Sequence, residues 1–547
     1  MACSRPRRRI MSAPADARRW PALPLSESNG QFRESHQASV RYRLPLAILS
    51  VIGTVTILLS TRHYGAGLSP DSVGYIAIAR HIATGMGALT LDGTPLLLHP
   101  PLYPALLAAI DYVFGIDPFS SAHIVNAVLF GLIVYLSGLL FLKHLKSSAA
   151  FALLGTASVL VAVPLIHVSL MAWSEPLFIC FVLLYLILCE SYLAKADTTS
   201  LLFLSLSVAL ASLTRYIGVI FILTGVVSIL FFRRTSPRVT FRHLFLFISI
   251  SALPIGIWVI RNYCLSGTVF GPRASSTYTL SQNVTLAFDT VLSWYIPGRV
   301  SEYRSILMLL SAIIGFLAGL STRGHWLKVR TVLLWIGPLL LFIVAYVGVL
   351  VVASTTTAYD QIGERLLSPV FVSITLLLLS LASKILTSLT EQGLSQKRAN
   401  ILLMVAIAVW LVDPTRTAIS SIINAMKRGQ GYSSEYWRSS QTSEYLLQNR
   451  TLQSECVIYT NAPDALYVLA NLTAKMSPSR RMSNAPDILN DISSFRGSWP
   501  EERNACLVWF DKIGRQYLFT VDELQTIANV QQIIRLEDGR VYSVARK

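Results

Sequence analysis

The sequence is short of charge for its length. Charged residues make up 14% of the 547 positions and hydrophobic residues 53%, whereas soluble domains carry about 25% charged residues. This balance excludes an ordinary soluble globular protein. Apolar stretches long enough to cross a hydrocarbon core of about 30 Å recur between residues 44 and 413, and the composition then turns polar. The sequence therefore predicts a membrane part, residues 44–413, and a soluble C-terminal part, residues 414–547.

Cysteine is scarce, and glycine-rich nucleotide-binding patterns are absent. Six cysteines are too few for a disulfide scaffold. Cys456 and Cys506 can form a disulfide if the tail lies outside the cell, but the sequence alone does not decide this. Rossmann and P-loop patterns are missing, which argues against an enzyme that binds a nucleotide in a soluble domain. The sequence also has no convincing internal repeat.

Positive charge lies at membrane boundaries rather than on a soluble face. A formal net charge of +17 would suggest nucleic acid if it covered one exposed surface. The arginines instead precede the first apolar span or crowd the short loop at residues 233–242, as the positive-inside rule expects. We therefore expect no nucleic-acid partner, a cytoplasmic basic tail at residues 1–43, and a first span that is retained as an anchor.

The apolar stretches predict about eleven transmembrane helices, several of them short. The stretch at residues 200–232 is divided at Arg215, because a single helix there would place the arginines of residues 233–242 outside. Residues 102–114 are too few for a crossing and predict an interfacial or re-entrant helix within a long external loop, residues 63–119. The expected spans lie near residues 44–62, 120–142, 149–167, 175–194, 200–213, 216–232, 243–262, 304–320, 330–352, 367–388 and 399–413.

The tail at residues 414–547 predicts a small external α/β domain. Residues 456–460 and 506–510 have the composition of short buried strands. Residues 464–472 and 521–530 have the apolar spacing of helices. The chain is therefore expected to be an all-α polytopic membrane protein that carries a small α/β domain at its C-terminus.

Acidic residues stand at two predicted membrane boundaries. Asp71 follows Pro70 where a helix would begin, and the apolar spacing after it suits an amphipathic helix on the membrane surface. A helix N-cap is the alternative role, because aspartate is favoured there. The prolines of residues 100–104 fix a rigid turn that can hold His99 near the lipid head groups. Glu175 stands at the mouth of a later span, where it can also be a favourable charge at the positive end of a helix.

This order of motifs resembles the C-type (GT-C) glycosyltransferases, in the bacterial branch related to protein mannosyltransferases and lipid A aminoarabinose transferases (family 39-like). Asp71 matches the acidic residue that serves as catalytic base in that family, and Glu175 matches a second acidic residue at a later span. Residues 100–103 match its Pro-Pro-Leu-Tyr motif. Family members often carry lysine before the two prolines, in contact with the donor phosphate, and His99 stands here instead.

The resemblance implies a GT-C-like membrane region and a set of site residues. Asp71 and Glu175 are implied to be catalytic. In the tail, residues 431–434 and 459–467 also resemble segments of the bacterial homologues. The residues implied to bind the donor phosphate or the substrate are His99, Tyr103, Arg215, Arg261, Arg273, Glu364 and Arg365.

The chemistry of such a transfer explains these residue types. Moving a sugar from a polyprenyl phosphate to a hydroxyl requires a carboxylate to take the acceptor proton and cations to stabilise the departing phosphate. Arginine forks onto phosphate oxygens and stays charged, and we expect Arg365 and Arg273 to fill this role before Arg261. Any of these arginines can instead snorkel or bind ordinary lipid head groups. The absence of a nucleotide-binding pattern favours a lipid-linked donor.

The sequence makes no cofactor certain. Asp71 and Glu175 can hold a divalent cation, Mg²⁺ or Mn²⁺, through their oxygens, but two carboxylates on distant loops are a weak metal signal. The histidines at positions 81, 99, 123 and 167 lack close metal-ligand spacing, and we interpret them as structural or polar-contact residues.

Together these features favour an inverting hexosyl- or pentosyltransferase of the bacterial cell envelope, acting on the external face of the inner membrane. Its expected partners are a polyprenyl-phosphate sugar donor, a lipid, glycan or protein acceptor, and membrane lipids. One alternative is a transporter or flippase of a lipid-linked or anionic substrate, which would place ionisable groups near mid-membrane and often show paired repeats. Another is a non-catalytic anchoring protein. The sugar, the acceptor and the role of the tail stay open.

Overall fold

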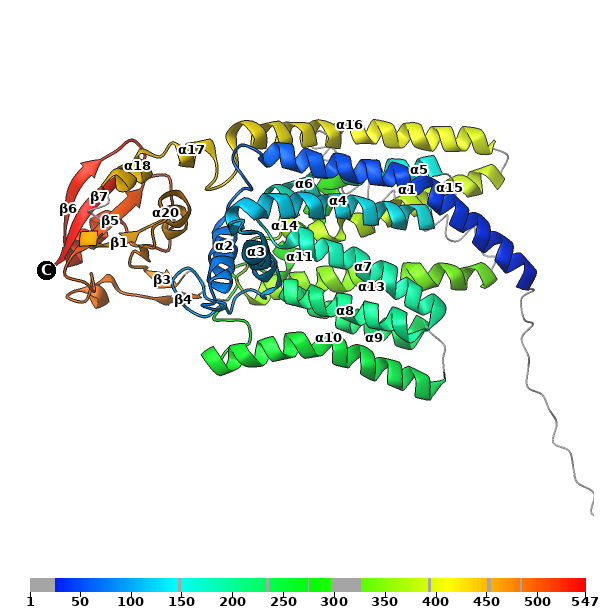
Figure 1. Ribbon diagram of the computed structural model, residues 1–547, viewed down its shortest axis with the longest axis horizontal. Helices are drawn as coiled ribbons and strands as arrows, with labels where there is room; N and C mark the ends of the chain where they lie inside the picture. The colour runs from blue at the N-terminus through cyan, green and yellow to red at the C-terminus, as the bar shows by residue number, and fades with distance from the viewer. Residues whose placement is uncertain are drawn as a thin grey trace, which may run out of the picture. The chain divides into compact units, whose positions relative to one another are not determined.

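The structure, a computed structural model, describes residues 25–145, 149–232, 236–273, 275–296, 326–391, 395–449, 454–482 and 485–547. The chain divides into two compact units, Met1–Leu44 and Pro45–Lys547, and helix α1 (Leu25–Thr61) begins in the first of them. In the described chain the named strands all follow residue 456, and the part before them is helical (Figure 1).

The membrane part and the loops that join its helices are built from helical elements of very different length. They are α2 (Pro70–Ala83), α3 (Leu102–Phe114), α4 (Pro118–His144), α5 (Ala149–Leu160), α6 (Val163–Leu170), α7 (Glu175–Lys195), α8 (Thr198–Thr214), η1 (Tyr216–Val219), α9 (Ile220–Phe232), α10 (Pro237–Ser266), α11 (Leu280–Tyr295), α13 (Trp326–Thr356), α14 (Glu364–Leu367), η3 (Ser368–Val370), α15 (Phe371–Glu391) and α16 (Gln396–Arg428).

Long apolar helices form the membrane spans, because an α-helix satisfies its own backbone polar groups in lipid. Among the described residues, seven helices are long and apolar enough to cross a membrane, or eight if the bent pair α5 and α6 is one span. This pair bends by 45°, just before Pro164 in the first turn of α6. The seven are α1 from Tyr42, α4, α7, α10, α13 from Trp335, the run from α14 into α15 (Glu364–Ile385), and α16.

The expected division of the apolar stretch at Arg215 is confirmed. Helix α8 ends at Thr214, Arg215 is extended, with φ −146° and ψ 137°, and η1 and α9 continue to Phe232. The segment expected at residues 102–114 is α3, a short apolar helix that runs across the long helices, next to α2 (Figure 1). The span expected near residues 304–320 lies outside the described residues.

Small residues let neighbouring spans approach closely. The Ser50 hydroxyl donates to the carbonyl oxygen of Gly131 at 2.7 Å, and a Cβ at Gly131 would overlap the side chain of Thr54. A Cβ at Gly225 in α9 would likewise overlap the ring of Phe247 in α10. Close backbone approach at small residues is how helices associate in lipid, where burial of apolar surface gives little driving force.

A mixed five-stranded sheet forms the centre of the C-terminal domain. Its order is β2-β1-β5-β7-β6, with β1 parallel to β2 and β5, and β7 antiparallel to β5 and β6. Successive residues of β5 face opposite sides, so Val508 belongs to one buried cluster and Leu507 to another. The bounds are α17 (Glu435–Arg438), α18 (Gln441–Gln448), β1 (Val457–Thr460), α20 (Pro463–Ala470), β2 (Lys475–Met476), β3 (Arg481–Met482), β4 (Ala485–Leu489), η4 (Ile492–Phe495), β5 (Ala505–Phe510), α21 (Val521–Ile527), β6 (Ala528–Arg535) and β7 (Gly539–Arg546).

The expected α/β character of the tail is confirmed, with one correction. The strands expected at residues 456–460 and 506–510 are β1 and β5, and the helix expected at residues 464–472 is α20. The helix expected at residues 521–530 is wrong at its end, because α21 stops at Ile527 and the chain continues as β6, which pairs with β7.

Helix α16 continues beyond the expected start of the tail at residue 414. It ends at Arg428 and contains Pro414. Proline removes one backbone hydrogen bond and bends a helix, but α16 continues past Pro414. The polar residues after Pro414 therefore extend the last membrane helix rather than begin the C-terminal domain.

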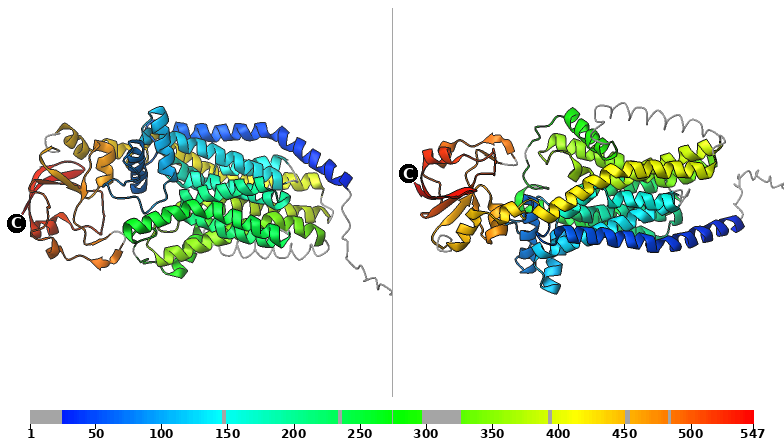
Figure 2. Two further views of the ribbon diagram at one scale, coloured as in Figure 1. Left: turned by 60° about the horizontal axis from the view of Figure 1, so that its bottom comes forward. Right: turned by 90° about the horizontal axis from the view of Figure 1, so that it is seen from above.

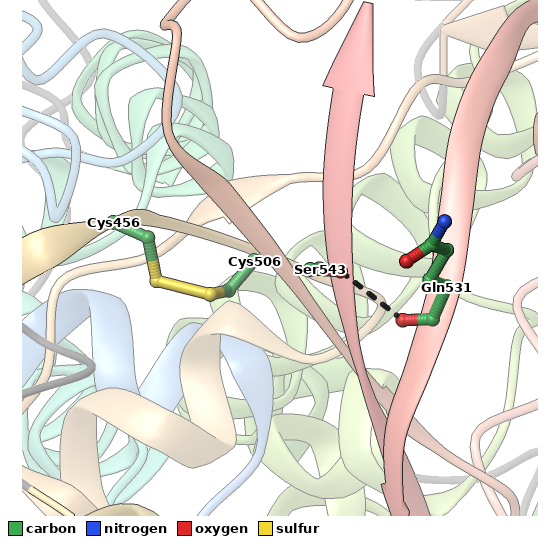
Figure 3. The surroundings of a disulfide bond; sticks show 4 residues. All are labelled: Cys456, Cys506, Gln531 and Ser543. Carbon is green, nitrogen blue, oxygen red and sulfur yellow. Dashed lines mark hydrogen bonds between the residues drawn. A yellow bond between two sulfur atoms is a disulfide. The ribbon is translucent and has the colours of Figure 1, made fainter.

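A disulfide joins two neighbouring strands of the large sheet. Cys456, directly before β1, is bonded to Cys506 in β5, with their Cα atoms 5.8 Å apart (Figure 3). Nearby, the Ser543 hydroxyl in β7 donates to the carbonyl oxygen of Gln531 in β6 at 3.4 Å (Figure 3). Cys456 and Cys506 therefore form the disulfide that the sequence alone did not decide.

The tail is paired with the loop that precedes α2. Residues 429–434, here called the junction segment, run beside residues 66–68. The Tyr432 N–H donates to the carbonyl oxygen of Leu68 at 2.9 Å, and the Ser433 hydroxyl donates to a carbonyl oxygen of the same loop at 2.6 Å. Both views of Figure 2 place the C-terminal domain at the end of the long helices where α2 lies.

The same loop also pairs with the segment before α7. The Gly67 N–H donates to the carbonyl oxygen of Leu170 at 2.8 Å, and the Ala172 N–H donates to that of Gly67 at 2.9 Å. Residues 66–68 therefore lie between the tail and the segment before α7, directly before α2.

We expect loss of the disulfide to destabilise the C-terminal domain. For a sequence separation of 50 residues, the chain-entropy model gives about 4 kcal/mol. The measurement is the unfolding midpoint of the full-length protein carrying Cys456→Ser and Cys506→Ser. Cys264→Ser, at an exposed free cysteine, is the matched control. An unchanged midpoint in the double variant would contradict the expectation.

We expect Gly431→Ala to loosen the junction segment. Gly431 has φ +56°, and an added Cβ would overlap the carbonyl oxygen of Leu68. Left-handed backbone at a non-glycine residue costs about 1–3 kcal/mol, and the overlap adds to this. Gly514→Ala, where no heavy atom lies within 4 Å of the added Cβ, is the control. The two variants should differ in unfolding midpoint and in protease cleavage between α16 and α17; equal behaviour would contradict the structure.

Candidate active site

Ser69 caps α2 and leaves Asp71 free to face the neighbouring helices. The Ser69 hydroxyl accepts from the Ser72 N–H at 3.4 Å, and the Ser72 hydroxyl accepts from the Ser69 N–H at 3.1 Å, which is a capping box. The Trp173 indole donates to the Ser69 hydroxyl at 2.8 Å and ties α2 to the segment before α7. The alternative role of Asp71 as the N-cap is therefore wrong.

Glu175, the first residue of α7, is buried between two arginines. Its side chain is 1% exposed, and its Oε1 lies 2.5 Å from Arg215 NH1 and 2.7 Å from Arg365 Nε. Its other oxygen, Oε2, has no hydrogen-bond partner in the described part of the chain. A charged carboxylate is tolerated in a buried position only when it is paired. The two guanidinium groups therefore make this position possible for Glu175.

Arg365 joins three carboxylates through its three nitrogens. Nε donates to Glu175 at 2.7 Å, NH2 donates to Asp71 Oδ2 at 2.7 Å, and NH1 donates to Asp360 Oδ2 at 2.9 Å. The guanidinium also lies 4.1 Å from the centroid of the Trp173 ring, within cation–π distance. Because its partners come from α2, α7 and the loop before α14, this one side chain fixes those elements relative to one another.

His99 borders Asp71 at the exposed edge of the cluster. Its Nε2 lies 3.9 Å from Asp71 Oδ1, and its Nδ1 lies 3.4 Å from the Tyr75 hydroxyl. The Tyr75 hydroxyl also contacts the Ser174 hydroxyl at 3.3 Å. The side chains of Asp71 and His99 are each 33% exposed, so a substrate can reach both of them.

Side chains from later segments of the chain hold the backbone that leads to His99. Arg261 donates to the carbonyl oxygen of residue 96 at 2.6 Å, Tyr216 to that of residue 97 at 2.7 Å, and Arg273 to that of residue 98 at 2.9 Å. The Arg273 guanidinium also lies 4.7 Å from the centroid of the Tyr359 ring. Arg261 and Arg273 therefore contact this backbone rather than the carboxylates around Arg365.

Tyr103 and Glu364 lie outside the cluster around Arg365. Tyr103 is fully buried, and its hydroxyl donates to Asn126 Oδ1 at 3.2 Å. Glu364 Oε2 lies 3.9 Å from His167 Nδ1, and both side chains are more than 40% exposed. The structure thus brings together Asp71, Glu175, Arg215 and Arg365, with His99 beside them, and places the other expected residues at the margins.

The surrounding charges set the ionisation of Asp71. Burial raises the pKa of the Asp71 carboxyl, but nearby positive charge, from His99 and then Arg365, lowers it more, and the net pKa lies below its ordinary value. Burial lowers the pKa of His99 below its ordinary value, and nearby arginines add to this, although the Asp71 charge acts in the opposite direction. The lowered pKa of His99 favours its neutral form at pH 7, where Arg365 and then Arg215 supply the positive charge that acts on Asp71.

Asp360 is a member of the cluster that was not predicted from the sequence. Its side chain is 68% exposed and reaches Arg365 from the loop that links α13 to α14. The available signal was an acidic residue just after a long apolar run and five positions before a candidate arginine. That signal is weak, because exposed aspartates are common in loops.

The carboxylates do not form a ready ligand set for a metal. Asp71 and Glu175 both contact the Arg365 guanidinium, which occupies the space that a shared cation would need. Among the described residues, no group of three or more His, Cys, Asp and Glu side chains is arranged to hold a metal ion. We therefore derive no step through a divalent cation.

We expect Arg365→Ala to destabilise the protein by about 3 kcal/mol, near the lower end of the range for breaking a buried pair, because Arg215 still neutralises Glu175. Arg540→Ala is the control, since its ion pair with Asp511 is 32% exposed on each side and contributes about 1 kcal/mol or less. The measurement is the unfolding midpoint of both variants. Equal losses would argue against a central role for Arg365.

Solved structures with a similar fold include membrane glycosyltransferases. ArnT from Cupriavidus metallidurans in the apo state matches with a TM-score of 0.57 and 13% sequence identity, covering 91% of this chain and 97% of that chain. The same protein bound to undecaprenyl phosphate matches with a TM-score of 0.54 and 13% identity over the same shares. The archaeal oligosaccharyltransferase AglB from Archaeoglobus fulgidus, in complex with an inhibitory peptide and a dolichol-phosphate, has a TM-score of 0.54 and 12% identity, covering 86% of this chain and 69% of that chain.

Sequence comparison adds no closer relative. No protein-family model matches the chain, and no curated protein matches it in sequence. The structural matches extend over both the helical part and the C-terminal domain, since they cover about nine-tenths of the chain. The chain is therefore a multi-pass integral membrane protein with the GT-C glycosyltransferase fold.

Proposed function

We propose that this protein is a membrane glycosyltransferase that moves a sugar from a polyprenyl-phosphate donor to a hydroxyl of a lipid, glycan or protein acceptor. The observation that carries the proposal is the position of Asp71, an ionised and reachable carboxylate fixed by Arg365 next to a second, buried carboxylate. The fold supports the choice of donor, because ArnT binds undecaprenyl phosphate and AglB binds a dolichol-phosphate.

Asp71 is the general base in this proposal. Arg365 holds its Oδ2 at 2.7 Å, while Oδ1 faces His99 at 3.9 Å and is free to accept a proton. As the acceptor oxygen attacks the anomeric carbon, its proton passes to Asp71. The new carbon–oxygen bond forms while the bond to the phosphate breaks, and the phosphate leaves with the electron pair. Direct attack opposite the phosphate inverts the anomeric carbon.

Arg273 is a better candidate than Arg365 for the donor phosphate while Asp360 stays bound to Arg365. All three nitrogens of Arg365 are engaged by carboxylates. Arg273 forms no ion pair with any described residue, and its buried Nε–H has no hydrogen-bond partner among them. A guanidinium with an unused donor next to the backbone before His99 suits a phosphate oxygen.

The disulfide supports an external site. Disulfides persist in oxidising compartments, so the Cys456–Cys506 bond favours a tail outside the cytoplasm. The junction segment pairs the tail with the loop just before Asp71, so the site lies on the same side as the tail. For a bacterial chain this is the external face of the inner membrane.

The transporter alternative is less well supported. Glu175 is the first residue of α7, Arg215 directly follows α8, and Arg365 is the second residue of α14. The charged side chains thus gather where helices begin and end, whereas transporters place their ionisable groups near mid-membrane.

We expect Asp71→Asn to lower transfer by a factor of about one hundred or more, because a general base contributes 10²–10⁴ in rate. The assay follows a radiolabelled sugar from its polyprenyl phosphate into membrane extract, with purified full-length protein. Asp289→Asn, at an exposed position in α11, makes the same chemical change and should leave transfer intact.

The unfolding midpoints of both variants show whether a loss of transfer comes from a folding defect. Equal transfer by wild type and Asp71→Asn would remove Asp71 from the role of base, and no transfer from any lipid-linked sugar would favour the transporter. The same assay with and without EDTA tests whether Mg²⁺ or Mn²⁺ takes part.

A further inference from the structure

One loop contacts both arginines that were candidates for the donor phosphate. Tyr359 and Asp360 are neighbours in the loop between α13 and α14. Asp360 Oδ2 accepts from Arg365 NH1 at 2.9 Å, and the Tyr359 ring covers the Arg273 guanidinium at 4.7 Å. Arg365 and Arg273 are therefore contacted by two adjacent residues of one loop.

The three carboxylates on Arg365 differ in how firmly they are held. Glu175 is 1% exposed and cannot leave without exposing a buried helix end, and Asp71 is 33% exposed and lies in a capped helix. Asp360 is 68% exposed and belongs to a loop. Exposed ion pairs contribute about 0–1 kcal/mol, so the Asp360 contact is the one that is easily broken.

The charge balance also singles out Asp360. Asp71, Glu175 and Asp360 face two guanidinium groups, those of Arg215 and Arg365. These five side chains are therefore negative by one charge, which weakens the attraction of the nearby Arg273 for a phosphate. Movement of Asp360 into solvent removes that excess and frees the NH1 group of Arg365 as a donor for a phosphate oxygen.

We propose that Asp360 occupies the place of the donor phosphate and is displaced from Arg365 when the lipid phosphate binds. Tyr359 moves with it, because the two residues are adjacent, and uncovers Arg273. Asp360 is thus a positioning residue that competes with the donor for one nitrogen of Arg365. This inference rests on the proposed function, since it takes a polyprenyl phosphate as the ligand.

The test is the affinity of the full-length protein for undecaprenyl phosphate in detergent, measured by calorimetric titration. Asp360→Asn should bind undecaprenyl phosphate about fivefold more tightly than wild type, which corresponds to removal of one competing exposed ion pair. Asp360→Glu, which restores the charge, should bind as wild type does. Asp289→Asn, with the same loss of one exposed charge in α11, should also bind as wild type does.

Undecaprenol, which lacks the phosphate, separates competition for the phosphate from an effect on the lipid chain. Its affinity should be the same for wild type and Asp360→Asn. Tighter binding of undecaprenol by the variant would overturn the inference, as would equal or weaker binding of undecaprenyl phosphate. If neither protein binds undecaprenyl phosphate, the proposed function fails and the inference fails with it; binding of equal strength by both overturns the inference alone.

Discussion

The site depends on one guanidinium that is shared by carboxylates from separate parts of the chain. Arg365 lies 294 positions from Asp71 and 190 positions from Glu175 in sequence, yet it donates to both. A helix that begins with a buried carboxylate is tolerated in an apolar bundle only if cations meet it there. The requirement to neutralise Glu175 therefore brings α14 against α7, and the same contact places Asp71 beside them. The same ion pairs of Arg365 therefore hold the helices together and form the site.

The site residues that could be predicted are those whose chemistry conflicts with their surroundings. Charged groups next to long apolar runs, such as Asp71, Glu175 and Arg215, have few structural roles in a membrane. Their meeting in one cluster brings together the start of α2, the start of α7 and the end of α8. Asp360 could not be found in this way, because an exposed loop aspartate is ordinary and only its contact with Arg365 gives it meaning.

The fold could be predicted where hydropathy determines the secondary structure, and less well where contacts with a distant segment determine it. The bilayer forces backbone groups into helices, so the seven long spans of the described residues, and the break at Arg215, could be predicted from composition and charge. Residues 528–530 were expected to continue a helix, but they form a strand because they pair with β7. Likewise Ser69, not Asp71, caps α2, and one of the groups that holds Ser69 comes from distant Trp173.

The junction segment has a consequence for the order in which the protein is made. The Ser433 hydroxyl meets its partner carbonyl 367 positions earlier in the chain, and the entropy cost of closing a loop grows with its length. During synthesis, the loop before Asp71 waits without this partner until the last membrane helix has been inserted and the chain beyond it has emerged. A partly made copy therefore lacks the contact that joins residues 66–68 to the tail.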